Sequence, residues 1–266
     1  MERAVLVPSV PLLDTLDWIG HDRLYLGNGY CQRLIPTPDQ LRSALDRADD
    51  AHLPLTLITP PVTDKGLDDL APILDILPKG AEVVANDWGV IDLVAEEGRL
   101  EPVVGGLLHK QKRGPRLMMA KDLLTPEAWE RFRTSNMDVA AMRGLLASYG
   151  VKRIEVENPF QGVSLDLAGG DKPLLGSLHH PYVCVTMSRY CLIALASTRQ
   201  GRPEWGVYPC SRACTNSSFQ LDHPTMGVPL YLQGCAVFVK NDALPSEKEL
   251  KGMGIDRTVE SPIPPA

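Results

Sequence analysis

The sequence lacks any long hydrophobic run. Residues 1–8 contain no apolar stretch long enough for a signal peptide, and no later segment approaches the ~18 apolar residues that span a bilayer. The sequence also has neither a Gly-x-Ser-x-Gly nucleophile elbow nor a His-Glu-x-x-His helix, so the usual machinery of serine and zinc peptidases is missing. We therefore expect a cytoplasmic protein with no membrane span and no standard peptidase site.

An excess of positive charge and an internal repeat are absent as well. The net charge of −6 argues against a general nucleic-acid binder, although a local basic rim can still attract a small anion. With 266 residues, 44% of them hydrophobic, the chain is long enough for one domain with a sizeable core. We expect that domain to cover residues 1–260 and to be followed by an extended, loose tail, residues 261–266.

Short apolar runs that are typical of strands alternate with helical stretches along most of the chain. Eight runs are predicted as strands: Ala4–Val7, Leu24–Gly27, Leu55–Thr59, Glu82–Ala85, Pro102–Leu107, Arg153–Glu157, Tyr182–Thr186 and Ile255–Val259. This alternation favours a parallel sheet, and eight strands favour a TIM-like (β/α) barrel over an open doubly wound sheet. In such a barrel, residues just past the carboxyl ends of the strands share one rim.

Three further segments have recognisable local signals. Thr37-Pro38-Asp39-Gln40 combines an N-cap, a proline at the first helical position and a capping-box glutamine, so it predicts the start of an amphipathic helix. A second helix is predicted from Met137 to Tyr149. Residues 230–239 are predicted as a β-hairpin that packs beside or caps the barrel, and this hairpin and the cysteine segment 184–214 interrupt the alternation.

Cysteines gather late in the chain, because four of the six lie between residues 184 and 214. Disulfides are disfavoured in a reducing cytosol, so clustered thiols indicate a metal centre or a redox group. Cys31 follows the second predicted strand, and on a shared rim it can meet Cys191, Cys210 and Cys214, giving the four thiolates of a closed cluster or a zinc site. Arginines close in sequence would offset the negative charge of such a centre: Arg189, Arg202 and Arg212.

The remaining candidate ligands leave the identity of the metal open. Cys184 lies within a strand-like run and Cys235 at a hairpin turn, so both are predicted to be small buried residues, with Cys184 the better substitute ligand. His223 can replace one thiolate in a zinc site. The residues alone therefore do not separate an iron–sulfur cluster from zinc.

Polar side chains at other strand ends are candidates for binding and proton transfer. Asp87 and His109 follow the fourth and fifth predicted strands and could move protons, although a lone Asp or His at a strand end is often structural. Arg113 and Arg116 belong to the basic stretch 110–116, which predicts either an anion-binding arginine fork or a solvated loop.

Several of these segments resemble a known family. Residues 85–90, Ala-Asn-Asp-Trp-Gly-Val, and residues 105–116, which include Lys110-Gln111-Lys112-Arg113, are similar to the NDWG and KQKR-PR motifs of the collagenase-like peptidase U-thirty-two family. The pattern of residues 24–27 before Cys31, then Ser188-Arg189-Tyr190-Cys191, then Cys210 and Cys214, is most similar to its UbiV-like branch. The likeness covers nearly the whole chain.

The resemblance implies a TIM-like barrel that holds a [4Fe–4S] cluster on Cys31, Cys191, Cys210 and Cys214, whereas Cys184 matches a ligand only in the UbiU-like pattern. It implies a part in oxygen-independent hydroxylation with prephenate as the oxygen donor, acting on a ubiquinone precursor in some members and on RNA bases in others. It also implies a heterodimer with a UbiU-like protein of the same family. The two carboxylates of prephenate would suit the predicted arginine fork.

Two other hypotheses come from different functional classes. One is a peptidase or hydrolase, which the family name suggests and the missing motifs oppose. The other is a non-catalytic iron–sulfur or zinc protein, in which the metal serves structure or electron transfer while another chain holds the substrate.

Overall fold

Eight parallel strands close into a barrel, in the order β1-β12-β7-β6-β5-β4-β3-β2. The computed structural model describes residues 1–189, 191–197 and 210–266, so the predicted residues Tyr190 and Arg202 lie outside it. The barrel strands are β1 (Glu2–Val7), β2 (Arg23–Leu26), β3 (Leu55–Thr59), β4 (Glu82–Ala85), β5 (Glu101–Val104), β6 (Arg153–Glu157), β7 (Leu175–His180) and β12 (Ile255–Glu260). The predicted TIM-like barrel is confirmed.

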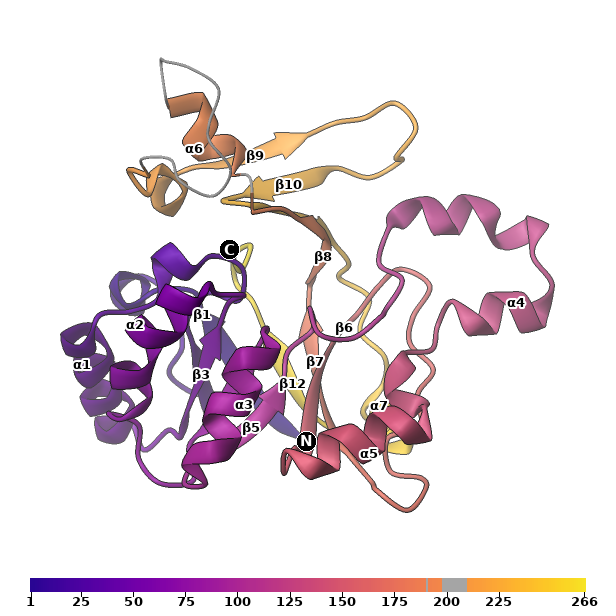
Figure 1. The fold of residues 1–266 in the computed structure, drawn as a ribbon. Helices are drawn as coiled ribbons and strands as arrows, with labels where there is room; N and C mark the ends of the chain where they lie inside the picture. The colour runs from indigo at the N-terminus through magenta and orange to yellow at the C-terminus, as the bar shows by residue number, and fades with distance from the viewer. Residues whose placement is uncertain (190, 198–209) are drawn as a thin grey trace.

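Helices surround the strands (Figure 1). The α-helices described are α1 (Pro38–Asp50), α2 (Asp64–Leu74), α3 (Trp88–Glu97), α4 (Pro126–Arg131), α5 (Ala140–Ser148), α6 (Leu192–Ser197) and α7 (Glu247–Gly252). Helix α1 begins as predicted, since the Gln40 amide donates to Thr37 Oγ1 at 3.3 Å and the Thr37 amide donates to Gln40 Oε1 at 2.9 Å. No helix among the described residues has the length and apolar composition needed to cross a bilayer.

The barrel core follows from the two-residue period of the strands. In β1, Ala4 and Leu6 belong to the cluster inside the barrel, whereas Val5 and Val7 pack in the larger cluster between the strands and the helices. Because both faces of β1 are covered, its sequence is a nearly continuous apolar run, as is usual in parallel sheets.

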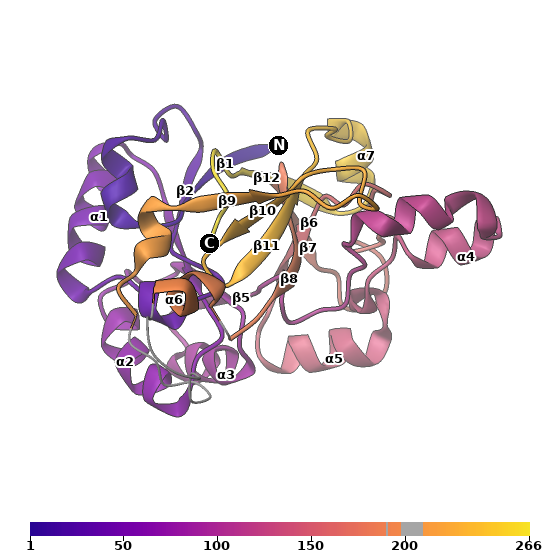
Figure 2. The same cartoon turned by 90° about the horizontal axis from the view of Figure 1, so that it is seen from above.

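A second sheet of four antiparallel strands crosses the carboxyl end of the barrel (Figure 2). Its order is β8 (Tyr182–Met187), β11 (Ala236–Lys240), β10 (Leu230–Gln233) and β9 (Ser218–Leu221). Strands β10 and β11 form the predicted hairpin, and their turn contains Gly234 and Cys235. This sheet carries the late part of the chain over the barrel rim.

The prediction of the seventh barrel strand is wrong. The predicted run, residues 182–186, forms β8 of the second sheet, while β7 lies just before it and pairs with β6 and β12. Strand β7 has little apolar periodicity because Ser177 and His179 bond to polar groups inside the barrel. Gly176 is closely packed, since a Cβ there would lie 2.7 Å from Leu167 Cδ1 and 2.9 Å from Ile255 Cγ1, so these side chains would have to shift.

Two other predicted boundaries need correction. Strand β5 ends at Val104 and not at Leu107, because the chain turns at Gly105, where a Cβ would lie 2.2 Å from Asn86 Oδ1. Helix α5 begins at Ala140, after a 3₁₀ turn at Asn136–Asp138 that the Ser135 side chain caps.

The tail after β12 is extended, as expected, but the expectation of a loose end is wrong. The Ser261 amide donates to the His180 carbonyl oxygen at 2.8 Å, and Ser261 is only 3% exposed. Ala266 is buried against Cys184, Ala236 and Phe238. The tail is therefore packed between the barrel and the second sheet.

A buried ion-pair network joins the amino-terminal halves of the barrel strands. Arg257 donates to Glu2 Oε2, to Glu82 Oε2 and to the Tyr25 hydroxyl, each at 2.6 Å, and it is only 2% exposed. Arg153 adds a contact of 3.6 Å to Glu82. Although burial opposes ionisation of Glu82, the arginines outweigh it and lower the pKa of this carboxyl. The network links the first strand of the barrel to the last.

We expect the substitution Arg257→Met to lower the free energy of unfolding by about 3–5 kcal/mol, because it leaves Glu82 buried without its main counter-charge. The matched control Arg42→Met removes an exposed pair with Asp39 and should cost less than about 1 kcal/mol. Urea denaturation of both variants measures the difference. Equal losses would show that the barrel network contributes no more than a surface pair.

Candidate functional site

Cys31 reaches the carboxyl rim of the barrel on the loop after β2. The Asn28 side chain holds this loop, since its Oδ1 accepts the amides of Tyr30 and Cys31 at 2.9 Å each. Cys31 then precedes a 3₁₀ turn, residues 32–34. A short polar side chain that bonds to backbone amides two and three residues later fixes a turn of this kind.

The late cysteines arrive at the same place from the second sheet. Cys191 lies between β8 and α6, its thiol donates to the Gly234 carbonyl oxygen at 3.3 Å, and its sulfur accepts the Ala194 amide at 3.4 Å. Cys214 is buried within a 3₁₀ turn, and Gly234 has a φ of 58°, a conformation that favours glycine. The turn of the β10–β11 hairpin thus contacts the segment that carries Cys191.

Five thiols line one cavity of about 120 Å³, which we call the thiol cavity. They are Cys31, Cys191, Cys210, Cys214 and Cys235. All five are free cysteines. The four cysteines predicted from sequence to share a centre therefore lie together, joined by a fifth that was predicted to be only a buried residue.

Cys31 and Cys235 both line the thiol cavity, and the Cys235 thiol also donates to the Tyr30 carbonyl oxygen at 3.3 Å. The hydrogen bond from the Cys235 thiol outweighs the effect of burial and, with the charges of Arg33 and Arg212, lowers the pKa of Cys31 to about 6. The same contact, together with burial, raises the pKa of Cys235. Burial also raises the pKa of Cys214, to about 11. Cys31 is thus readily ionised at neutral pH, whereas the raised pKa values of Cys191, Cys214 and Cys235 mean that their thiolates need a nearby cation.

The thiols that line the cavity are candidate ligands of a metal centre. Within residues 1–189, 191–197 and 210–266, no three His, Cys, Asp or Glu side chains form a group that could hold one metal ion. Zinc needs four ligands at ~2.0–2.3 Å from one point, whereas a cubane cluster occupies a volume between its thiolates. If a cluster of this kind binds here, Cys31, Cys191, Cys210 and Cys214 are the residues that would hold it.

The alternative ligands lie elsewhere. Cys184 is buried in β8, opposite Phe238 of β11, its thiol donates to the Thr186 carbonyl oxygen at 3.6 Å, and burial raises its pKa. It is not one of the residues that line the thiol cavity. His223 lies on an exposed loop, where its Nδ1 is 3.0 Å from the Thr225 hydroxyl. The geometry gives neither residue a place at the thiols.

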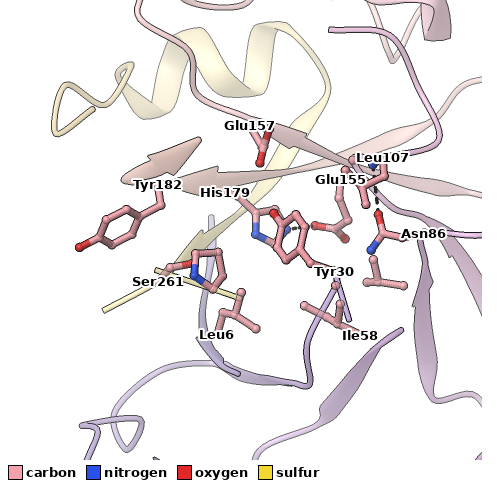
Figure 3. Close-up of a pocket in the computed structure, with 14 residues that line it drawn as sticks. Leu6, Tyr30, Ile58, Asn86, Leu107, Glu155, Glu157, His179, Tyr182 and Ser261 are labelled. Atoms are coloured by element: carbon pink, nitrogen blue, oxygen red, sulfur yellow. Dashed lines mark hydrogen bonds and ion pairs between the residues drawn. The ribbon is translucent and has the colours of Figure 1, made fainter. Parts of the chain in front are cut away.

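A second cavity, of about 40 Å³, lies in the mouth of the barrel, and we call it the barrel-mouth cavity (Figure 3). Its polar lining includes Asn86, Glu155, Glu157, His179 and Ser261. Its apolar lining includes Leu6, Ile58, Val84, Leu107 and Pro265. Tyr30 lines both cavities, so the two are separated by little more than one side chain.

Asp87 and His109, the predicted proton-transfer residues, have structural contacts. Asp87 caps α3 by accepting the Gly89 amide at 2.8 Å. His109 is buried, with Nε2 2.7 Å from the Glu155 carbonyl oxygen and Nδ1 3.1 Å from the Ser135 hydroxyl, and burial lowers its pKa to about 4. These contacts give both residues a structural role. A catalytic role for Asp87 and His109 stays a prediction.

Arg113 and Arg116, the predicted anion fork, are separated in the structure. Arg113 Nε is 2.5 Å from Glu157 Oε2, and the guanidinium also donates to the Gly106 carbonyl oxygen. Arg116 is exposed and donates to the Thr225 hydroxyl at 2.7 Å. Arg113 therefore already has an anionic partner, and binding of a carboxylate by this pair stays a prediction.

Comparisons with known proteins add little to this geometry. No family model and no curated protein sequence matches the chain. Among solved structures, it is similar to a mutant GH18 chitinase from Cycas revoluta in complex with (GlcNAc)4, at 10% identity and a TM-score of 0.31, over 98% of this chain and 94% of that one. A plant class V chitinase mutant from Cycas revoluta gives 11% identity, the same TM-score and the same coverage. Scores this low carry no argument about family or chemistry.

Sequence reasoning missed Cys235, Glu155 and His179. Cys235 follows a glycine in a hairpin turn, a place where a buried apolar contact is the simplest interpretation. Glu155 alternates with apolar residues in β6, and a charged residue in a fully buried strand of a barrel is a usable signal for an interior site. His179 belongs to the strand that the hydrophobic pattern did not reveal.

In the reduced, metal-free protein, alkylation of Cys31 by iodoacetamide should increase with pH around a midpoint of about 6, whereas Cys214 should follow a midpoint of about 11. Peptide mass spectrometry after timed quenching measures each site. In Cys235→Ala the midpoint of Cys31 should move upward, because the hydrogen bond to its sulfur is lost. A common midpoint for Cys31 and Cys214 would contradict the described contacts.

Proposed function

We propose that this chain is an iron–sulfur protein that holds a [4Fe–4S] cluster on Cys31, Cys191, Cys210 and Cys214. One observation carries the proposal: a thiol from the first quarter of the chain and three from its last third line a single cavity. Four thiolates are the ligand set of such a cluster. When bound, the cluster supplies one-electron chemistry.

The surroundings of the cavity support this assignment. Arg33 and Arg189 line it, and positive charge there offsets the negative charge of a thiolate-bound centre. The Ala194 amide already donates to the sulfur of Cys191, which is the kind of contact that tunes a cluster's potential. The residues of this chain thus supply ligands, counter-charge and hydrogen-bond donors.

We further propose that the protein acts in oxygen-independent hydroxylation of the ubiquinone-precursor type, in the cytoplasm, with prephenate as oxygen donor and a UbiU-like protein as heterodimer partner. This part rests on the family resemblance of residues 85–90, of residues 105–116 and of the cysteine pattern. The enzyme would then be the pair, with this chain as one component. A zinc centre is the second candidate; the family resemblance favours the cluster, and His223 is not among the residues that line the thiol cavity.

Anaerobic purification should yield about four iron and four acid-labile sulfide per chain, with visible absorbance that bleaches on reduction. Cys191→Ser should lose most of the iron, because it removes one of the four thiolates. Cys184→Ser serves as the matched control and should retain it, since this thiol lies outside the cavity. One equivalent of zinc without sulfide in the wild type would reject the cluster.

A UbiU-like protein that is produced together with this chain should co-purify with it in a one-to-one ratio. The complex is expected to persist in Cys184→Ser and can be measured by size-exclusion chromatography coupled to light scattering under nitrogen. A cluster-loaded chain that elutes separately from the UbiU-like protein would leave the iron–sulfur assignment intact and reject the proposed pair.

A further inference from the structure

The barrel-mouth cavity has the composition of a ligand site and no part in holding the thiols. Apolar side chains from different strands form its walls, and a few polar groups converge on it (Figure 3). Its place at the carboxyl ends of the strands is where barrels of this type carry their chemistry. Small-molecule sites generally combine an apolar lining with a small number of fixed polar groups.

A buried His–Glu pair is the main polar feature of this cavity. His179 Nε2 lies 2.6 Å from Glu155 Oε2, and the other oxygen of that carboxylate accepts the Tyr25 hydroxyl at 3.1 Å. Tyr25 also packs edge-on against the His179 ring, with centroids 5.9 Å apart. The Glu155 carboxylate therefore fixes the orientation of the His179 ring, and the Tyr25 hydroxyl in turn fixes the carboxylate.

This arrangement determines which nitrogen of His179 is free to act on a ligand. Nε2 carries the hydrogen that is donated to Glu155, so in the neutral ring Nδ1 is an acceptor. Nδ1 makes no hydrogen bond to the described residues, and Figure 3 shows the ring bordering the cavity beside Tyr30. A ligand hydroxyl is the complementary donor.

The charges around the cavity favour an uncharged ligand. Glu155 accepts hydrogen bonds from His179 and Tyr25, and Glu157 is paired with Arg113 at 2.5 Å. None of the described residues lining the cavity is a lysine or an arginine. A carboxylate or phosphate would face two glutamates with no unengaged cation to receive it.

We propose that the barrel-mouth cavity binds a small uncharged organic molecule through a hydroxyl group that donates to His179 Nδ1, with its hydrocarbon part against Leu6, Ile58 and Val84. Binding needs neither the cluster nor a partner chain, so this inference is independent of the proposed function. If both hold, the ligand lies one side chain, Tyr30, away from the thiol cavity.

Three matched probes test the proposal on the metal-free full chain: cyclohexanol, methoxycyclohexane and cyclohexanecarboxylate. Calorimetric titration should show cyclohexanol binding at least about fivefold more tightly than the ether, which lacks the donor, and should show the carboxylate as the weakest. Equal binding of alcohol and ether, or a preference for the carboxylate, overturns the inference. Failure of cyclohexanol to bind overturns it as well.

Variants locate the probe. His179→Phe keeps a planar ring but removes the acceptor, and should weaken cyclohexanol binding by about tenfold. Leu107→Trp, on the partly exposed loop after β5, should block the cavity and abolish binding even if the histidine variant does not fold. His180→Gln is the control, since His180 is the next residue in β7 and does not line the cavity. Unchanged binding in folded His179→Phe or in Leu107→Trp contradicts the assigned site.

The outcomes separate this inference from the proposed function. Cyclohexanol binding without iron or sulfide in the anaerobic protein would reject the cluster and keep the ligand site. A full complement of iron and sulfide without cyclohexanol binding would support the cluster and reject the ligand site.

Discussion

The parallel pairing of β1 with β12 is the constraint on which the rest of the structure depends. It joins the first strand to the last, with Glu2 opposite Arg257, and thereby closes the barrel. Closure places the carboxyl ends of all eight strands on one rim. The loop after β2 and the sheet that follows β7 consequently meet above the same opening, and both cavities form where they meet.

Much of the fold could be predicted because buried parallel strands leave continuous apolar runs in the sequence. Seven of the eight predicted barrel strands are present, and the capping box of α1 and the β10–β11 hairpin form where their local signals lie. Strand β7 was missed because its inward-facing residues Ser177 and His179 are polar and make hydrogen bonds inside the barrel, while Gly176 is closely packed. A strand whose side chains bond inside a barrel loses the alternation that would identify it.

The candidate site, like the fold, could be predicted from the sequence only in part. A shared rim predicts that Cys31 and the late cysteines lie on the same side of the barrel, and the second sheet, which crosses this rim, then brings the late cysteines to the loop after β2. The place of Cys235 and the pairing of His179 with Glu155 depend instead on the register between strands, which sequence patterns do not record. Asp87 and His109 were chosen for their positions at strand ends, yet their hydrogen bonds hold the loops that shape the barrel mouth.

The distance along the chain between Cys31 and Cys214 sets an order of events during synthesis. Cys31 leaves the ribosome early. The other side of the thiol cavity forms only after the second sheet has been synthesised and has folded over the rim. An inorganic cofactor delivered before then would find isolated thiols. A cofactor that needs Cys31 together with the late cysteines could therefore bind only after the second sheet has been synthesised, and it would then link the first and last parts of the chain.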